Sequence, residues 1–293
     1  ASRLSLSKCY EKAPEILKVH GSVIGTLGNF SASIGKAKSK KTFNVSAIVA
    51  AALKNGTALR YVAELPEDKR KILYVDTEQS PYHCLKVMKR ILRMADLPDD
   101  RDNESLEFLA LRKYTPGQRI RIVEQAIYNT PDIGLVIIDG IRDMVYDINS
   151  PSESTHIISK LMQWTDERQI HIHTILHQNK GDENARGHIG TELNNKAETI
   201  LLVEKDKNNG DISNVSAMHI RAMDFEPFAF RINDNALPAH HRAAAPHRIG
   251  SCFRTERGIR LQGTGRCLNQ NLCVSRCKTE PSKGGTAHHH ASE

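Results

Sequence analysis

The chain has 293 residues, of which 39% are hydrophobic and 26% are charged, and its formal net charge is +7. This length fits one large domain, or one domain with an appendage. The sequence shows neither a secretory signal nor an apolar run of about 18 residues, so we expect a soluble, cytoplasmic protein rather than a secreted or membrane-spanning one.

Helical and strand patterns alternate along the first part of the chain. Residues 1–20 are polar with a short helical pattern, residues 21–34 predict one or two strands, and a helix is predicted from Phe43 to about Asn55-Gly56, a good C-terminal stop. The nearly continuous apolar run at 133–138 is typical of a strand buried on both faces. Further strands are predicted at 71–76, 106–111, 133–139 and 170–177, and further helices between Pro81 and Leu97, at 119–128 and after Ser150-Pro-Ser-Glu-Ser154.

The pattern changes near residue 199. Three strands separated by short turns are predicted at 199–204, 215–223 and 227–232. Strands that alternate with helices imply a parallel sheet covered on both faces, and the late strands add antiparallel partners at one edge. We therefore predict an α/β fold whose mostly parallel sheet is flanked by helices and carries antiparallel strands at its C-terminal edge.

The last part of the chain differs in composition from the rest. Residues 236–293 hold nine Lys/Arg and three acidic residues, and so carry six of the seven net positive charges. They show neither helix nor strand periodicity, and of their four cysteines only Cys273 and Cys277 are close enough for a zinc-ligand pair. We predict a folded domain at 1–235 followed by a basic, low-complexity, disordered tail at 236–293, with a small folded basic module as the alternative.

Residues 31–43 carry the first chemical signal. A strand-like run stops at Gly35, a cationic loop follows, and Lys41-Thr42 opens a helix. This is the layout of a phosphate-binding loop, G-x-x-x-x-G-K-[ST], in which backbone N–H groups and the helix N-terminus cradle a polyphosphate. Lys41 would then reach the β- and γ-phosphates, and Thr42 would ligate Mg²⁺. The predicted phosphate-binding residues are Gly35, Lys36, Ala37, Lys38, Ser39, Lys40, Lys41, Thr42 and Phe43.

One position departs from this motif, because Lys40 stands where the second glycine belongs. Glycine suits that position since the backbone approaches phosphate closely, sometimes with a positive φ that a side chain penalises. The lysine would strain the loop, whereas Lys36, Lys38 and Lys40 would add charge for the phosphates. We favour retained nucleotide binding; the alternative is a solvated basic loop that binds polyanions without specificity.

Polar residues follow three further predicted strands. Glu78 lies just past Val75-Asp76, Asp139 ends the aliphatic run at 135–138, and His177-Gln178-Asn179 ends the strand at 170–176. Ligands of parallel α/β sheets bind at the carboxyl ends of the strands, so we expect these residues near the Gly35 loop. Asp139 is suited to support Mg²⁺, and Glu78 to polarise an attacking water. The alternatives are an ordinary strand-end aspartate and an acid that stabilises a helix N-terminus.

The order and spacing of these motifs resemble the RecA-like ATPases, and within them the hexameric helicase branch typified by plasmid RepA and DnaB. The resemblance covers about residues 15–233. It implies a RecA-like fold, ATP and Mg²⁺ as cofactors, and catalytic roles for Lys41, Glu78, Gln178 and Arg221. Gln178 would couple the γ-phosphate to DNA, and Arg221, or as second choice Arg186, would reach the nucleotide of a neighbouring subunit. The residues that carry the resemblance are Gly35–Thr42, Tyr74–Glu78, Leu135–Asp139, His177–Asn179 and Met218–Arg221.

The resemblance also implies partners. Single-stranded DNA would be held by loops at 142–154 and 179–191, and the chain would form a homo-oligomer, by analogy a hexameric ring. The second loop offers Lys180, Arg186 and His188, together with several glycines. Phosphate contacts from such loops need no sequence preference.

Three functions fit these observations. The leading hypothesis is an ATP-hydrolysing helicase or DNA-remodelling motor that serves plasmid or mobile-element replication, the last part by family analogy alone. The second is a nucleotide-gated regulatory DNA-binding module with little or no hydrolysis, which Lys40 supports and Glu78 argues against. The third is a nucleotide-dependent transferase or kinase, which would need an acceptor site and a lid that the sequence does not indicate.

Overall fold

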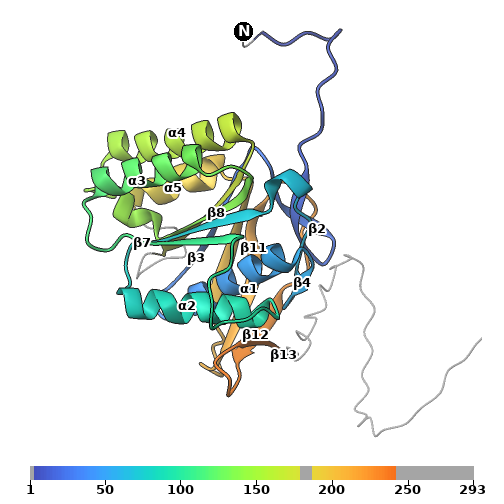
Figure 1. The fold of residues 1–293 in the computed structure, drawn as a ribbon, viewed down its shortest axis with the longest axis vertical. Coiled ribbons are helices and arrows are strands. Elements are labelled where there is room, and N and C mark those ends of the chain that lie inside the picture. Colours follow the sequence, from blue (N-terminus) through green and yellow to red (C-terminus); the bar gives the residue numbers. More distant parts are fainter. Residues whose placement is uncertain (1–2, 179–186, 242–293) are drawn as a thin grey trace, which may run out of the picture. The chain divides into compact units, whose positions relative to one another are not determined.

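The computed structural model describes residues 3–178 and 187–241, which form two sheets and five α-helices (Figure 1). The large sheet has the strand order β13-β12-β11-β10-β3-β9-β8-β6-β7. Its strands are β3 (Phe30–Gly35), β6 (Lys71–Asp76), β7 (Leu106–Ala110), β8 (Ile133–Asp139), β9 (His171–His177), β10 (Thr199–Lys205), β11 (Ile212–Ile220), β12 (Phe228–Ile232) and β13 (Pro238–His241). The small sheet has the order β2-β1-β5-β4, with β1 (Glu15–Val19), β2 (Ser22–Thr26), β4 (Thr57–Ala58) and β5 (Tyr61–Ala63).

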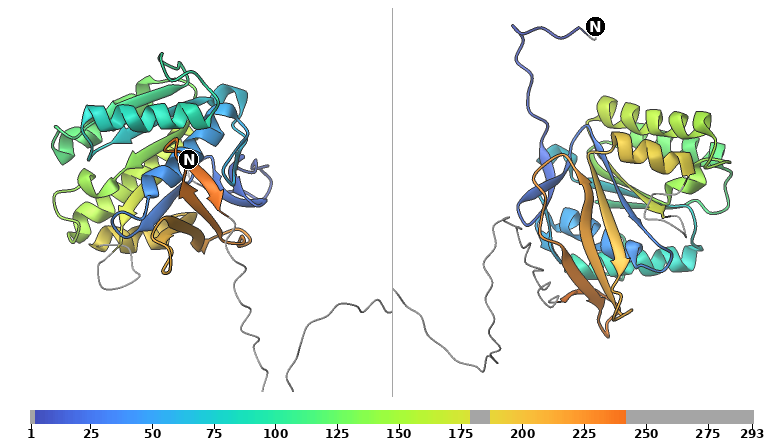
Figure 2. Two further views of the ribbon diagram at one scale, coloured as in Figure 1. Left: turned by 90° about the horizontal axis from the view of Figure 1, so that it is seen from below. Right: turned by 180° about the vertical axis from the view of Figure 1, so that it is seen from behind.

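The predicted architecture is confirmed. All pairings from β10 through β3, β9, β8 and β6 to β7 are parallel, whereas β11, β12 and β13 follow β10 as antiparallel strands. Two helices, α1 (Lys41–Lys54) and α2 (Pro81–Met94), lie on one face of the large sheet. The opposite face is covered by α3 (Pro116–Asn129), α4 (Pro151–Arg168) and α5 (Gly187–Lys196), and Figure 2 shows the same layers from two further sides.

The core is divided by the large sheet into two clusters. On β8, Leu135 and Ile137 belong to the cluster under α1 and α2, whereas Val136 and Ile138 belong to the cluster under α3, α4 and α5. Every residue of β8 is buried, as the apolar run predicted. The small sheet adds side chains such as Leu17 and Tyr61 to the α1 side. The central strands are therefore held from both faces, and their carboxyl ends are fixed in place.

Local signals explain where the helices begin. Ser150 accepts a hydrogen bond from the backbone N–H of Glu153, and Pro151 follows at the first helical position of α4, as expected from the serine-rich segment. Thr115 and Gln118 form a reciprocal capping box at the start of α3. No helix within residues 3–178 and 187–241 is long and apolar enough to cross a lipid bilayer.

The prediction for residues 1–20 is wrong at its end, because residues 15–19 form strand β1 instead of a helical segment. Strands β1 and β2 pair through His20-Gly21, which both have positive φ (49° and 85°). A two-residue turn of that kind matches the twist of a hairpin, and the histidine disguised the signal because glycine or asparagine usually stands there.

Both predicted DNA-binding loops contain regular structure, of which α5 and the turn η2 were not predicted. Of the loop at 179–191, residues 187–191 belong to α5, where Ile189 and Leu193 are buried at helical spacing. Lys180, Gly181 and Arg186 lie outside the described residues. The loop at 142–154 contains a 3-10 turn, η2 (Ile141–Met144), and the first turn of α4.

The sheet also continues beyond residue 235, the predicted end of the folded domain. After a turn held by the Asn233 side chain, residues 238–241 form β13 and pair with β12. Four residues are too short a segment for a periodic pattern to appear in the sequence. Residues 242–293, with most of the predicted tail and its four cysteines, lie outside the described residues.

Candidate functional site

A cavity of about 380 Å³ opens at the carboxyl ends of the parallel strands, between the Gly35 loop and α2. It brings together the predicted Lys41, Thr42, Glu78 and Asp139, although they lie far apart in the sequence. Its volume is within the range of small-molecule sites. The lining residues are Lys38, Ser39, Lys40, Lys41, Thr42, Phe43, Asp76, Glu78, Gln79, Val87, Arg90, Asp139, Ile175 and His177.

Lys40 adopts the backbone conformation that the motif reserves for glycine. Its φ and ψ are 68° and 30°, in the left-handed region, and Lys38 also has a positive φ of 64°. The Lys40 ammonium donates to the carbonyl of Asp211, 2.5 Å away in the turn between β10 and β11. The loop therefore keeps the expected path with a lysine in place of glycine, and the lysine side chain is anchored outside the loop.

Gly35, by contrast, has no room for a side chain. A Cβ at this position would lie 2.1 Å from the carbonyl oxygen of Val203 on β10. On the same side, the Ser213 hydroxyl donates to the carbonyl of Ser39 at 3.2 Å. The phosphate-binding loop is thus held against the β10–β11 hairpin by close backbone packing and by two hydrogen bonds.

Lys41 is buried inside the loop, with 5% of its surface exposed. Its ammonium donates to the carbonyls of Gly35 (2.8 Å) and Lys36 (3.0 Å), and to Nδ1 of His177 (3.2 Å). Burial lowers the pKa of Lys41 to about 8, although the nearby Asp139 and Glu78 carboxylates act in the opposite direction. An anion in the cavity would favour the charged form of this lysine.

Asp139 lies beside Thr42, as the motif predicts. Its Oδ2 accepts hydrogen bonds from the Thr42 hydroxyl (3.1 Å) and from the Tyr74 hydroxyl (3.0 Å). Burial, followed by the charge of Asp76, raises the pKa of Asp139 to about 7. A divalent cation would relieve this penalty, and a hydroxyl with one carboxylate is a donor set that suits Mg²⁺ when phosphates and water complete the shell. No group of three or more His, Cys, Asp or Glu within the described ranges could hold a metal without such partners.

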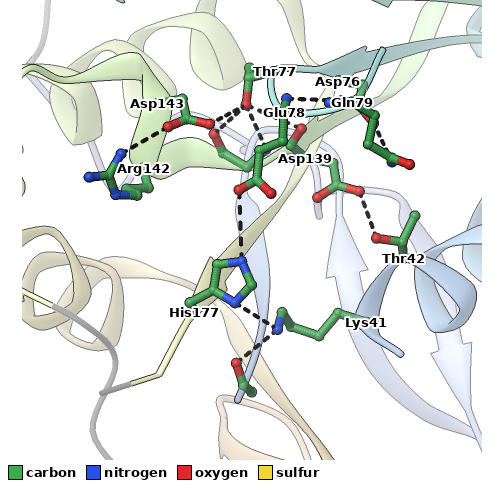
Figure 3. Close-up of polar contacts among 12 residues, drawn as sticks. Lys41, Thr42, Asp76, Thr77, Glu78, Gln79, Asp139, Arg142, Asp143 and His177 are labelled. Atoms are coloured by element: carbon green, nitrogen blue, oxygen red, sulfur yellow. Dashed lines mark hydrogen bonds and ion pairs between the residues drawn. The ribbon is translucent and has the colours of Figure 1, made fainter. Parts of the chain in front are cut away.

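Glu78 and His177 complete the polar network of the cavity (Figure 3). Nε2 of His177 lies 3.7 Å from Oε1 of Glu78, and His177 lowers the pKa of that carboxyl, followed in effect by Lys41 and Arg142. Because the Lys41 ammonium can only donate, Nδ1 of His177 accepts and the ring proton is assigned to Nε2, facing Glu78. Glu78 is thereby held ionised at the cavity.

Two residues of the cavity were missed as functional residues. His177 was predicted only as part of a motif, although its position at the carboxyl end of β9 was the available signal. Arg90 on α2 has its guanidinium 3.6 Å from the centre of the Phe43 ring. No motif in the sequence indicates Arg90, because only the packing of α2 against α1 brings it to the cavity.

Gln178 and Arg221 lie elsewhere. Gln178 is buried beside the loop, where its backbone N–H donates to the Gly35 carbonyl at 3.1 Å, but its side chain does not line the cavity. Arg221 follows β11, with its guanidinium 3.2 Å from the carbonyl of Lys196. Its backbone bonds to Glu198, which in turn bonds to Phe30 at the amino end of β3. Arg221 therefore lies at the amino ends of the parallel strands, on the side of the sheet opposite to the cavity at their carboxyl ends.

The sequence of residues 15–183 matches the family described as AAA domain. The chain belongs to this AAA domain family. The match spans the Gly35 loop, Glu78, Asp139 and His177, so the residues that line the cavity belong to the family's own domain, and the P-loop ATPase prediction is confirmed at this level.

Among solved structures, the RadB recombinase resembles this AAA domain protein with a TM-score of 0.51 and 15% sequence identity. The alignment covers 72% of this chain and 90% of the RadB chain. At this identity the likeness shows the fold, which is RecA-like as predicted. No curated protein matches the sequence.

Proposed function

We propose that this AAA domain protein binds and hydrolyses Mg²⁺-ATP and couples turnover to single-stranded DNA, as a helicase or DNA-remodelling motor. The observation that carries the proposal is the ionised Glu78, which faces a cavity that also holds Lys41, Thr42 and Asp139. A site for binding alone would need the lysine and the cation ligands, but it would not need a carboxylate positioned to accept a proton.

The residues divide the chemistry among them. Lys41 and the backbone of its loop would bind the β- and γ-phosphates, and Thr42 with Asp139 would hold Mg²⁺, which supplies positive charge to the phosphates. Glu78 would orient the attacking water and accept its proton. His177 would keep Glu78 in place and, because it also contacts Lys41, would respond to a γ-phosphate there. We assign this response to His177 rather than to Gln178, whose side chain does not line the cavity.

Arg221 supports an oligomeric enzyme. Arg221 lies at the amino ends of the parallel strands, whereas the cavity lies at their carboxyl ends. Subunits arranged head to tail would therefore bring Arg221 of one chain toward the nucleotide of the next. An arginine supplied in this way stabilises the charge on the transferred phosphoryl group. We propose a homo-oligomer on this ground, and a hexameric ring by family analogy.

DNA is the proposed partner because of the segments that follow the catalytic strands. The turn after β8 directly follows Asp139, so a ligand bound to this turn would lie next to the cavity. The structural relative RadB is a recombinase, and this also supports the proposal that the partner is DNA. The role in plasmid or mobile-element replication rests on family analogy.

The alternative is a nucleotide-gated module with little hydrolysis. Its main support was the non-glycine residue of the loop, but the Lys40 backbone adopts the left-handed conformation and its side chain is anchored by Asp211. The kinase alternative gains no support from Glu78, whose carboxylate faces His177 and has its pKa lowered by His177 and by the charge of Lys41.

The deciding experiment is Mg²⁺-ATP hydrolysis with and without single-stranded DNA. We expect turnover that DNA stimulates and that Lys41→Ala abolishes, whereas Lys12→Ala, which removes an exposed lysine on the β1 side, leaves turnover unchanged. Tight ATP binding without turnover under either condition would instead support the regulatory module. The absence of nucleotide binding would overturn the whole proposal.

A further inference from the structure

Arg119, near the start of α3, is a buried cation whose hydrogen-bond acceptors all come from loops at the cavity edge of the sheet. Only 9% of its surface is exposed. Its guanidinium donates to the carbonyls of Leu111 (3.2 Å), Arg112 (3.0 Å), Thr77 (3.3 Å) and Asp143 (2.7 Å). Four neutral carbonyls thus take the place of a carboxylate partner around a charge that is costly to bury.

These carbonyls belong to three different segments. Thr77 directly precedes Glu78 after β6, Leu111 and Arg112 follow β7, and Asp143 lies in η2 after β8. Arg119 itself does not line the cavity of the catalytic residues. The rigid fork of a guanidinium can hold several acceptors in fixed directions, which a lysine ammonium cannot do.

Thr77 reinforces the same link through its side chain. Its hydroxyl oxygen accepts the backbone N–H of Gly140 at 3.0 Å, and the hydroxyl lies 3.1 Å from Oδ2 of Asp143 (Figure 3). The turn that carries Glu78 and the turn that follows Asp139 are therefore connected twice, by Thr77 directly and by Arg119 from behind. A displacement of one turn has to be transmitted to the other.

We infer that Arg119 is a positioning residue that couples the segment after β8 to the catalytic turn at Thr77-Glu78. The inference rests on the proposed function, in which residues 142–154 contact DNA and Glu78 activates water. Binding of DNA to η2 would then adjust Glu78 through Arg119, so the link supplies the stimulation of turnover by DNA. Conversely, nucleotide in the cavity would order η2, although η2 does not line the cavity.

The test compares Arg119→Lys with Arg121→Lys, an exposed arginine on the same helix. Hydrogen exchange is measured at residues 76–80 and at residues 141–148, with and without a non-hydrolysable Mg²⁺-ATP analogue. In the wild type and in Arg121→Lys, we expect the analogue to slow exchange in both segments. In Arg119→Lys, we expect the analogue to slow exchange at 76–80 only. We also expect DNA to stimulate turnover no longer, so that the ratio of the rates with and without DNA falls to about one, while KM for ATP changes less than about twofold.

The outcomes separate the two ideas. Retained protection of 141–148 in Arg119→Lys, or equal loss of basal and stimulated turnover, overturns the inference and leaves the proposed function intact. A wild type that shows no protection at 76–80 binds no nucleotide there, and this overturns the proposed function. If Arg119→Lys does not fold, the wild type alone decides, since protection at 76–80 without protection at 141–148 contradicts the coupling.

Discussion

Lys40 shows how one residue can meet a demand that is usually placed on glycine. Its backbone is left-handed, which costs about 1 kcal/mol for a residue with a side chain, and its ammonium is anchored on the carbonyl of Asp211. The hydrogen bond offsets part of the backbone cost and ties the side chain to the turn between β10 and β11. The residue is therefore compatible with a working loop.

This balance can be measured with two substitutions at the same position. Lys40→Gly removes the anchor and also the backbone cost, whereas Lys40→Ala removes the anchor and keeps the cost. We expect Lys40→Ala to have a free energy of unfolding about 1 kcal/mol lower than Lys40→Gly, and Lys40→Gly to bind nucleotide at least as tightly as the wild type. Denaturant unfolding and nucleotide titration test this; an alanine variant as stable as the glycine variant would contradict the strained-lysine account.

Glu78 is the residue whose loss should separate binding from turnover. Glu78→Gln keeps the shape of the side chain and removes its ability to accept a proton. We expect turnover to fall by about 10² or more while nucleotide affinity changes little. Single-turnover hydrolysis and equilibrium binding provide the measurement, with Glu64→Gln, an exposed glutamate, as the control. A normal rate in Glu78→Gln would exclude Glu78 as the base.

At the scale of elements, β3 and β9 are joined by a buried chain of serines and histidines. Nδ1 of His171 faces the carbonyl of Thr26, so it carries the proton, and Nε2 of His171 must accept from Ser31. The Ser31 oxygen then accepts from Nδ1 of His173, whose Nε2 accepts from Ser33. One carbonyl thus fixes the direction of every hydrogen bond, and both histidines are neutral.

This chain of hydrogen bonds predicts acid sensitivity of the fold. Burial lowers the pKa of His173 to about 3 and also lowers that of His171, while the unfolded value is near 6.5. Between these values the unfolded state binds protons that the folded state does not, so stability is lost as pH falls below about 6.5, by up to about 1.4 kcal/mol per pH unit for each histidine. We expect His173→Gln to flatten the pH dependence of the unfolding free energy, and the exposed His219→Gln to leave it unchanged. Parallel curves for the wild type and His173→Gln would contradict this origin.

The elements that sequence reasoning predicted are those with a long periodic pattern or a strong end signal. The run at 133–138 and the serine-rich start of α4 are examples, and Asp139 could be placed at the site because β8 was unambiguous. Strand β1 and helix α5 were missed, since a histidine occupies the turn in one and glycines interrupt the other. Arg90 and Arg119 could not be predicted, because their positions depend on how helices pack on the sheet.

At the scale of the whole molecule, the cavity lies at the carboxyl ends of the parallel strands and Arg221 lies at their amino ends. If subunits share sites head to tail, each site combines the cavity of one chain with the arginine of its neighbour. We expect Lys41→Ala and Arg221→Ala to be inactive separately and to recover part of the turnover when mixed, because one supplies an intact arginine and the other an intact cavity. The ATPase rate of the mixture is the measurement.

The control for this experiment is a mixture of Lys41→Ala with the double variant Lys41→Ala/Arg221→Ala, in which no intact cavity exists. An Arg221→Ala protein with the wild-type rate would show that Arg221 takes no part in hydrolysis. A mixture no more active than its separate components would show that the arginine does not act between chains.

The burial of β8 on both faces has a consequence for the register in which this strand pairs with its neighbours. Alternation of apolar and polar residues normally prevents a strand from slipping by one position, but both faces of β8 are apolar, so a slip would merely exchange the two cores. The strand's terminal aspartate removes this ambiguity, because only one alignment places Asp139 opposite Asp76 and within reach of Thr42 and Tyr74. The residue that would support the metal therefore also specifies the pairing register of the central sheet. We expect Asp139→Val to weaken this register as well as the metal site.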